Sequence, residues 1–237
     1  MKKTVFILIA LIAATIIKVD AQYVQDRVTG ERLSVKRFDG IRGTPYFEED
    51  FAEGDIFLTD GTVFEDAMLR YNAYEDEIEY SHDGRLYALK NELVSEFHLR
   101  YNRGGGVTDT IIFRKGYKGE SLDSQTFYIV HYEGDITLLE RFTQRFQEDM
   151  VPGYGQASAE KRFTPTSRLF FKEEDKSVKQ VNNRRTSVLN ALTESSFFGR
   201  LTNEKRRELR QHIRDENLDM SKPSDIAILL EYYDENF

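Results

Sequence analysis

Short apolar and β-branched runs, separated by glycine-containing turns, fill the middle of the chain. Asp60-Gly61 and Asp83-Gly84 each stand between two such runs. An Asp-Gly pair in this setting is typical of a tight β-hairpin, because the turn needs positive φ. Ile78 and Tyr80 alternate with glutamates, as in a half-buried strand. The pattern therefore predicts hairpin-connected strands.

We expect roughly eight to ten strands on this pattern. They cover residues 55–59, 62–72, 78–80, 85–89, 93–101, 110–114, 126–132, 136–142, 168–172 and 177–181. Residues 136–142 have a helical alternative, since Leu139, Phe142 and Phe146 are spaced i, i+3, i+7, but the turn at Gly134 favours a strand. Residues 147–165 contain two prolines and two glycines and are expected to be irregular.

The spacing of apolar residues becomes helical after residue 181. A first helix is expected at residues 188–192. Thr202 is a suitable N-cap for a second helix, which carries Leu209 and Ile213 on one face, and Asn217 suits its left-handed end. These helices are too short to be stable alone in water, so they must pack on each other or on the sheet.

A third helix is expected to open at Ser221 and Pro223. Its apolar stripe consists of Ile226, Leu229, Leu230 and Tyr233. Strands without intervening helices indicate antiparallel pairing. The sequence thus predicts an α+β fold, with an antiparallel β-rich body over residues 22–181 (a curled sheet, a sandwich or a small open barrel). A C-terminal helical segment over residues 182–237 packs on or beside it.

The N-terminus has the features of a secretory signal peptide. Lys2 and Lys3 precede an apolar run over residues 5–17, and Val19 and Ala21 are small residues at the −3 and −1 positions of a cleavage point. We expect residues 1–21 to be removed after Ala21 and the protein to be periplasmic or secreted; the alternative is an uncleaved anchor. No second long apolar run follows, so no transmembrane helix is expected afterwards.

Composition excludes several function classes. The chain has 41 Asp and Glu against 33 Lys and Arg, a formal charge of −8, and no Cys. Duplex nucleic acid requires clustered cations, so nucleic-acid binding is not expected. Without Cys there is no disulfide scaffold, thiolate metal site or cysteine nucleophile. An exported chain of this kind does not rely on oxidative folding.

Motifs that carry chemistry are missing. Gly153-Tyr154-Gly155 lacks the third glycine of a dinucleotide loop, Gly104-Gly105-Gly106 lacks a following Gly-Lys, and no Gly-x-Ser-x-Gly elbow occurs. The four histidines, His82, His98, His131 and His212, show no metal-ligand spacing. We therefore predict no catalytic, cofactor-binding or metal-ligating residue and no cofactor.

Charged clusters have simple structural interpretations. Glu48-Glu49-Asp50 and the set Glu75, Asp76, Glu77 and Glu79 lack the spacing of a calcium loop, and we interpret them as solvated faces and edge-strand protection. The basic run Lys205-Arg206-Arg207, continued by Arg210 and Arg214, alternates with acidic residues. It predicts a mixed-charge helix face with i, i+4 pairs.

Tyrosine and one repeated tetrapeptide are the remaining features. Leu69-Arg70-Tyr71-Asn72 recurs as Leu99-Arg100-Tyr101-Asn102. Two equivalent ligand-facing strand ends would explain it, but no similarity surrounds the match, which favours chance. The strand region also holds Tyr71, Tyr74, Tyr80, Tyr87 and Tyr101. Sheet packing is the first explanation for them, and lining of a sugar, peptide or lipid site the second.

Several of these segments resemble a known family. Gly43-Thr44-Pro45-Tyr46, Asp60-Gly61-Thr62 and the first Leu-Arg-Tyr-Asn segment, with the C-terminal Leu230-Glu231-Tyr232-Tyr233, are similar to uncharacterised secreted proteins of Bacteroidetes-type Gram-negative bacteria. Asp76-Glu77-Ile78-Glu79-Tyr80 belongs to the same resemblance. It implies export and a β-rich body with a helical tail, and it assigns no activity and no functional residue.

Three functions remain open. The first is an exported, non-enzymatic scaffold that binds an envelope protein, a glycan or a small ligand. The second is a hydrolase of envelope or extracellular polymers, which a deep pocket with two convergent carboxylates would favour. The third is an assembly factor that docks through its helical tail, which an exposed stripe at Ile226, Leu230 and Tyr233 would favour.

Overall fold

A computed structural model describes residues 29–34, 37–102, 108–119, 121–151, 158–173, 178–181 and 202–237. The expected leader at residues 1–21 and the expected helix at residues 188–192 lie outside the described residues, as do the three consecutive glycines at 104–106.

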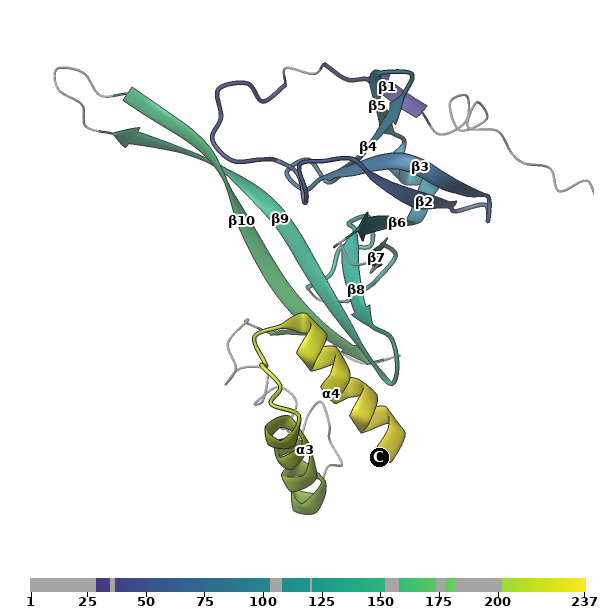
Figure 1. Cartoon of the computed structure of the whole chain (residues 1–237), viewed down its shortest axis with the longest axis vertical. Helices are drawn as coiled ribbons and strands as arrows, with labels where there is room; N and C mark the ends of the chain where they lie inside the picture. Colours follow the sequence, from purple (N-terminus) through teal and green to yellow (C-terminus); the bar gives the residue numbers. More distant parts are fainter. Residues whose placement is uncertain are drawn as a thin grey trace, which may run out of the picture.

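The described strands form one open antiparallel sheet, which confirms the α+β prediction (Figure 1). Its order is β1-β5-β4-β3-β2-β6-β7-β8-β9-β10-β11. The strands are β1 (Thr29–Arg32), β2 (Ala52–Leu58), β3 (Val63–Asn72), β4 (Glu77–His82), β5 (Arg85–Leu89), β6 (Val94–Asn102), β7 (Thr108–Arg114), β8 (Tyr128–Tyr132), β9 (Ile136–Val151), β10 (Ser158–Glu173) and β11 (Val178–Val181). A single 3-10 turn, η1 (Asn91–Leu93), precedes β6.

Both Asp-Gly pairs make the expected hairpin turns. Gly61 joins β2 to β3 with φ of 85°, and Asp83 and Gly84 join β4 to β5 with φ of 48° and 70°. Positive φ at both central residues is what a type I′ turn requires, and only the Asp83-Gly84 pair meets it; in the first pair only Gly61 has positive φ. Farther along β3, Asp66 also has positive φ, 56°, and the β2–β3 register shifts between Gly54 and Ile56. The acidic interruption in this strand is therefore a β-bulge.

The prediction of an irregular stretch at residues 147–165 is wrong for the residues of this range that the structure describes, 147–151 and 158–165. β9 continues to Val151, β10 starts at Ser158, and the two pair throughout as a long projecting hairpin (Figure 1). Pro165 lies inside β10, opposite Gln144. The N–H of Phe163 points away from β9 and bonds to the Arg42 carbonyl. The backbone nitrogen of Pro165, two residues later in the strand, points to the same side. Its missing N–H therefore interrupts no bond to β9, as is typical of an edge position.

Two helices follow the sheet. Thr202 caps α3 (Asn203–Asp215) by accepting from the Lys205 N–H, as predicted, and Asn217 ends it with φ of 50°. α4 (Pro223–Asn236) opens with Pro223 in its first turn, but its N-cap is Lys222 and not Ser221. No helix among the described residues has the length and apolarity needed to cross a membrane.

The hydrophobic core has two main parts. One covers a face of β2, β3, β4, β6 and β7 and is centred on Tyr71, Phe97 and Phe113. The other joins the two helices to the base of the β9–β10 hairpin through Leu138 and Phe171. Ile226, Leu229 and Leu230 are buried in this second part. The predicted helix stripe therefore holds the tail on the sheet and is not an exposed docking surface.

Candidate functional site

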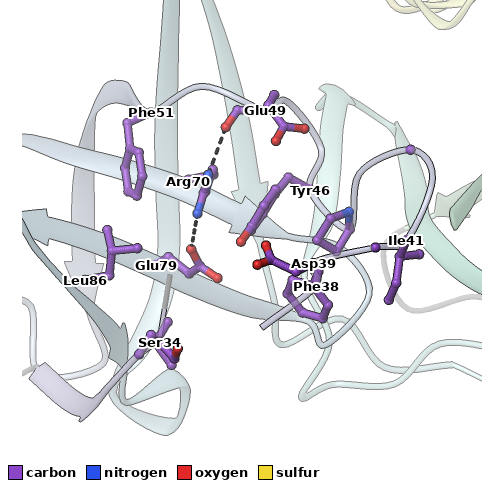
Figure 2. A pocket seen from close by; sticks show the side chains of 14 residues that line it. Ser34, Phe38, Asp39, Ile41, Tyr46, Glu49, Phe51, Arg70, Glu79 and Leu86 are labelled. Carbon is purple, nitrogen blue, oxygen red and sulfur yellow. Dashed lines mark hydrogen bonds and ion pairs between the residues drawn. The ribbon is translucent and has the colours of Figure 1, made fainter. Parts of the chain in front are cut away.

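A groove lies on the face of β3, β4 and β5 that is turned away from the first core. Residues 37–51, here called the strap, cross this face before β2 begins (Figure 2). The groove has a volume of about 550 Å³. Strap residues form one wall, and Arg70 of β3, Glu79 of β4 and Leu86 of β5 form the floor.

Main-chain bonds hold the strap at two points along its path. The Arg42 N–H bonds to the Lys161 carbonyl (2.9 Å), and the Phe163 N–H bonds to the Arg42 carbonyl (2.8 Å). The Phe47 N–H bonds to the Tyr71 carbonyl (2.9 Å). The strap thus ties the β9–β10 hairpin to β3 and gives the groove a fixed wall.

Strand alternation puts the charged floor of the groove on this outer face. Tyr71 and Ile78 point into the core, so their neighbours Arg70 and Glu79 point the other way. Arg70 Nη2 donates to Glu79 Oε2 (2.6 Å), and Nη1 donates to the Glu49 carbonyl (3.0 Å) (Figure 2). We call Tyr46, Arg70 and Glu79 the groove cluster.

Aromatic rings enclose the Arg70 guanidinium. Its central carbon lies 3.5 Å from the centre of the Tyr46 ring and 4.4 Å from that of Phe51. Stacking of this kind suits arginine, whose planar, weakly hydrated group can be buried between rings. The Nε of Arg70 is buried and has no hydrogen-bond partner. The cluster is therefore tightly enclosed but incompletely bonded.

Glu79 is 1% exposed and is held by two arginines. Arg37 Nη1 lies 3.6 Å from Glu79 Oε1, and the same guanidinium bonds to Glu75 and Glu77. The interpretation as a solvated, edge-protecting charge is wrong for Glu79, whereas Glu75 is exposed as predicted. β4 lies between β3 and β5, and Glu79 is buried because Arg37 and Arg70 neutralise it. A carboxylate paired in this way is a poor general acid or base.

The hydroxyl of Tyr46 stays protonated in this setting. Burial, together with the nearby negative charge of Glu79, raises the pKa of Tyr46 to about 12, although the Arg70 charge opposes the shift. Asp39 and Glu49 are exposed and line the groove. The groove therefore combines a neutral phenol, a compensated ion pair and two acidic lining residues, which suits binding by hydrogen bonds.

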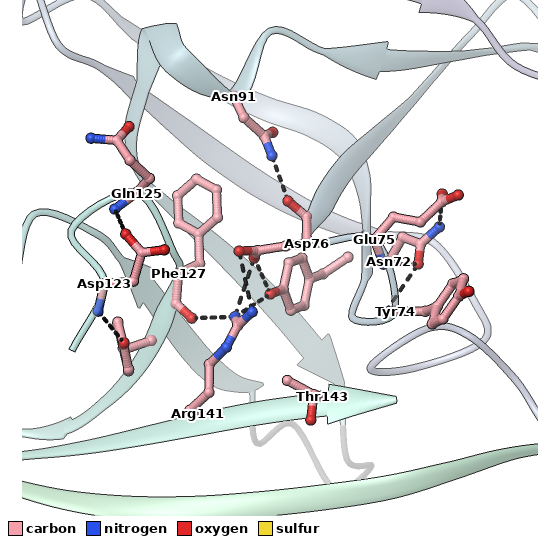
Figure 3. Close-up of polar contacts among 12 residues, drawn as sticks. Asn72, Tyr74, Glu75, Asp76, Asn91, Asp123, Gln125, Phe127, Arg141 and Thr143 are labelled. Carbon is pink, nitrogen blue, oxygen red and sulfur yellow. Dashed lines mark hydrogen bonds and ion pairs between the residues drawn. The ribbon is translucent and has the colours of Figure 1, made fainter. Parts of the chain in front are cut away.

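A second polar cluster lies on the core side of the sheet (Figure 3). Arg141 of β9 donates to both oxygens of Asp76 (3.2 Å each), to the Tyr71 hydroxyl (3.1 Å) and to the Phe127 carbonyl (2.9 Å). The Tyr71 hydroxyl donates to Asp76 (2.5 Å). We call Tyr71, Asp76 and Arg141 the bridging cluster, because it joins β9 to β3 and to the turn after β3.

The histidines do not assemble a catalytic arrangement in the described residues. His98 pairs with Glu96 (2.6 Å), and His212 stacks on Tyr232 with ring centres 3.8 Å apart. His131 contacts Glu140 (2.7 Å), which also accepts from Ser167. A serine nucleophile needs the histidine as its base, whereas here the carboxylate separates the two. His82 lies 3.5 Å from Asp83 and stacks on Tyr80.

The other sequence features have separate positions. The described residues contain no group of three or more His, Asp or Glu able to hold a metal ion. The predicted i, i+4 charge pairs of α3 do not form; instead Gln211 contacts both Asp215 (2.6 Å) and Arg214. In the repeated tetrapeptides, Arg70 lies in the groove, whereas Arg100 pairs with Asp55 and Asp66.

Among the five tyrosines, four pack within or against the first core. Tyr74 is the exception, at 44% exposed. No residue of the groove was predicted from the sequence to be functional. The signal that could have found Glu79 is the alternation of apolar and polar residues in this strand, because inward-facing Ile78 and Tyr80 place Glu79 on the outer face. Arg70 lies beside it, since the two residues pair in register between β3 and β4.

No family model, curated protein or solved structure matches the chain. The function must therefore be argued from the geometry of the groove itself.

Proposed function

We propose that the chain is an exported, non-enzymatic binding protein that holds a polar ligand in the groove between the strap and β3–β5. The groove cluster carries this proposal. Burying an ion pair contributes little to stability, because the cost of removing the charges from water offsets their attraction. A buried pair that is enclosed by the Tyr46 and Phe51 rings and placed beside a groove of about 550 Å³ is better explained by ligand recognition.

Export is the second part of the proposal. It is supported by the leader pattern at residues 1–21 and, separately, by the resemblance to secreted proteins. Processing after Ala21 would be seen as a mature N-terminus at Gln22. Cell fractionation that leaves the chain in the cytoplasm would contradict this part and leave the groove unaffected.

Binding is preferred over hydrolysis because the most buried carboxylate of the groove is already neutralised. Glu79 is 1% exposed and its two oxygens face Arg37 and Arg70, so a substrate in the groove cannot contact it directly. Docking through the helical tail has no support either, because its apolar stripe is covered by the sheet.

A single-tryptophan reporter tests the groove. The chain contains no Trp, so Phe51→Trp places one fluorophore beside Arg70. We expect saturable emission changes with at least one class in a panel of neutral oligosaccharides, basic peptides, nucleotides and fatty acids. Glu49→Gln, in the groove lining, should weaken the response, and Asp50→Asn, exposed beside it but outside the lining, should not. A panel without any saturable response would overturn the proposal.

A further inference from the structure

A surface of aromatic side chains continues from the groove toward the β9–β10 hairpin. It consists of Phe38, Tyr74, Phe146 and Phe163, and we call it the aromatic platform. Phe38 belongs to both places, because it lines the groove and contacts the platform rings. The groove and the platform are therefore continuous through one side chain.

The rings form a connected path. Successive ring centres lie 6.3 Å apart from Tyr46 to Phe38, 6.3 Å from Phe38 to Tyr74, and 6.4 Å from Tyr74 to Phe146. Phe163 lies against three of these rings and is buried, so it supports the path from within. Aromatic packing of this kind is rigid, which keeps the exposed rings in place.

Two rings on the path expose part of their surface to solvent. Tyr74 is 44% exposed and Phe146 is 37% exposed. They come from the turn after β3 and from β9, two segments far apart in sequence. In the groove, by contrast, Arg70 covers the Tyr46 ring. Stacking surface is thus available on the platform, and charged hydrogen-bonding groups are available in the groove.

We propose that the groove and the aromatic platform together bind an uncharged oligosaccharide, with its end in the groove and its following rings on Tyr74 and Phe146; this rests on the proposed function of the groove. Sugar hydroxyls donate and accept, so they can bond to the exposed acidic residues Asp39 and Glu49 of the groove lining. The apolar faces of sugar rings pack on aromatic side chains. The acidic groove lining disfavours polyanions.

The backbone of this region argues for a glycan and against an extended peptide. Peptides bound to sheets use the unpaired main-chain groups of an edge strand. Beside the platform, the edge of β10 is already bonded to Arg42 at Lys161 and Phe163, and Pro165 has no N–H to offer. A ligand here must be bound by side chains.

Calorimetric titration with neutral gluco-, manno- and N-acetylglucosamine oligomers of increasing length tests the inference. We expect one series to bind with affinity that rises with length. Tyr74→Ala and Phe146→Ala should each weaken the longer oligomers by roughly threefold to tenfold and leave the disaccharide unchanged. Ile228→Ala is the matched control, since Ile228 is 44% exposed but lies on α4.

The outcomes separate the two proposals. If a saccharide binds but its affinity does not depend on length or on Tyr74 and Phe146, the platform is not part of the site and the groove stands. If basic peptides or acidic polymers move the Phe51→Trp reporter and neutral sugars do not, the glycan inference is wrong while the groove still binds a ligand. If no probe binds at all, the proposed function fails first.

Discussion

The bridging cluster and the groove cluster contain the same three kinds of side chain, but they differ in what surrounds them. Each has an arginine, a carboxylate and a tyrosine, and the two lie on opposite faces of β3, where Arg70 and Tyr71 are consecutive. In the bridging cluster, Arg141 makes bonds with Asp76, Tyr71 and Phe127. In the groove cluster, Arg70 keeps an unbonded Nε.

Burial alone does not separate the two clusters. Glu79 is more buried than Asp76, although Asp76 lies on the core side of the sheet. What separates them is their surroundings: the bridging cluster lies on the core side of the sheet, whereas the groove cluster borders a cavity on the outer face. A polar network that joins distant segments on the core side of a sheet rigidifies the fold, and one that borders a cavity is a candidate binding site.

The largest expected effect is the loss of charge at Asp76. Asp76→Asn keeps a residue that tolerates the observed φ of 58° but leaves Arg141 without its counter-charge. We expect a loss of about 2–3 kcal/mol in the free energy of unfolding, measured with urea. Asp83→Asn is the control, because Asp83 also has positive φ but is 86% exposed. Equal losses in both variants would mean that backbone effects, and not the cluster, explain the result.

A smaller stability effect is expected when the groove cluster is replaced. In Arg70→Met/Glu79→Met, apolar side chains fill the space between the Tyr46 and Phe51 rings, and Arg37 keeps Glu75 and Glu77 as partners. Unfolding in urea should change by no more than about 1 kcal/mol, because buried ion pairs are often replaceable by apolar groups. Ligand binding should be lost. A loss as large as that of Asp76→Asn would make this cluster structural and end the contrast.

Local signals in the sequence predicted much of the fold. Asp60-Gly61 and Asp83-Gly84 encode their own turns, and Thr202 and Asn217 encode the ends of α3, because each depends only on neighbouring backbone. Pro165 was misinterpreted for the opposite reason. A proline is excluded from a central strand but not from an edge strand. Pro165 is at an edge because β11 pairs only with residues 169–172 of β10 and Arg42 bonds to β10 only at Lys161 and Phe163.

The candidate site was harder to predict, because its parts come from distant segments. The alternating pattern of β4 shows that Glu79 faces away from Ile78, but not that the strap covers it. Its two arginine partners lie on the strap and on β3. In the same way, Tyr74 and Phe146 meet only because the long hairpin returns past the turn after β3.

The smallest expected effect compares the two tyrosines at alkaline pH. Burial raises the pKa of Tyr46 from its ordinary 10.0 to about 12, and raises that of Tyr71 well above 10.0, with the charges of Glu79 and Asp76 adding to the shifts. A raised folded-state pKa means that the stabilisation is complete below pH 10 and is lost as the pH rises through the folded value.

Tyr46→Phe removes the titrating group, so urea unfolding of this variant should depend less on pH between about 10 and 12 than that of the wild type. Its stability at neutral pH should fall only slightly, because the variant loses the bond of the Tyr46 hydroxyl to Glu79 while the partners of Arg70 at Glu49 and Glu79 remain. Tyr71→Phe should instead lower stability at neutral pH, because Arg141 and Asp76 each lose a bond. Near-ultraviolet absorbance titration of each variant against the wild type identifies the ionisation of the replaced tyrosine. Equal losses of stability in the two variants at neutral pH would contradict the difference between the clusters.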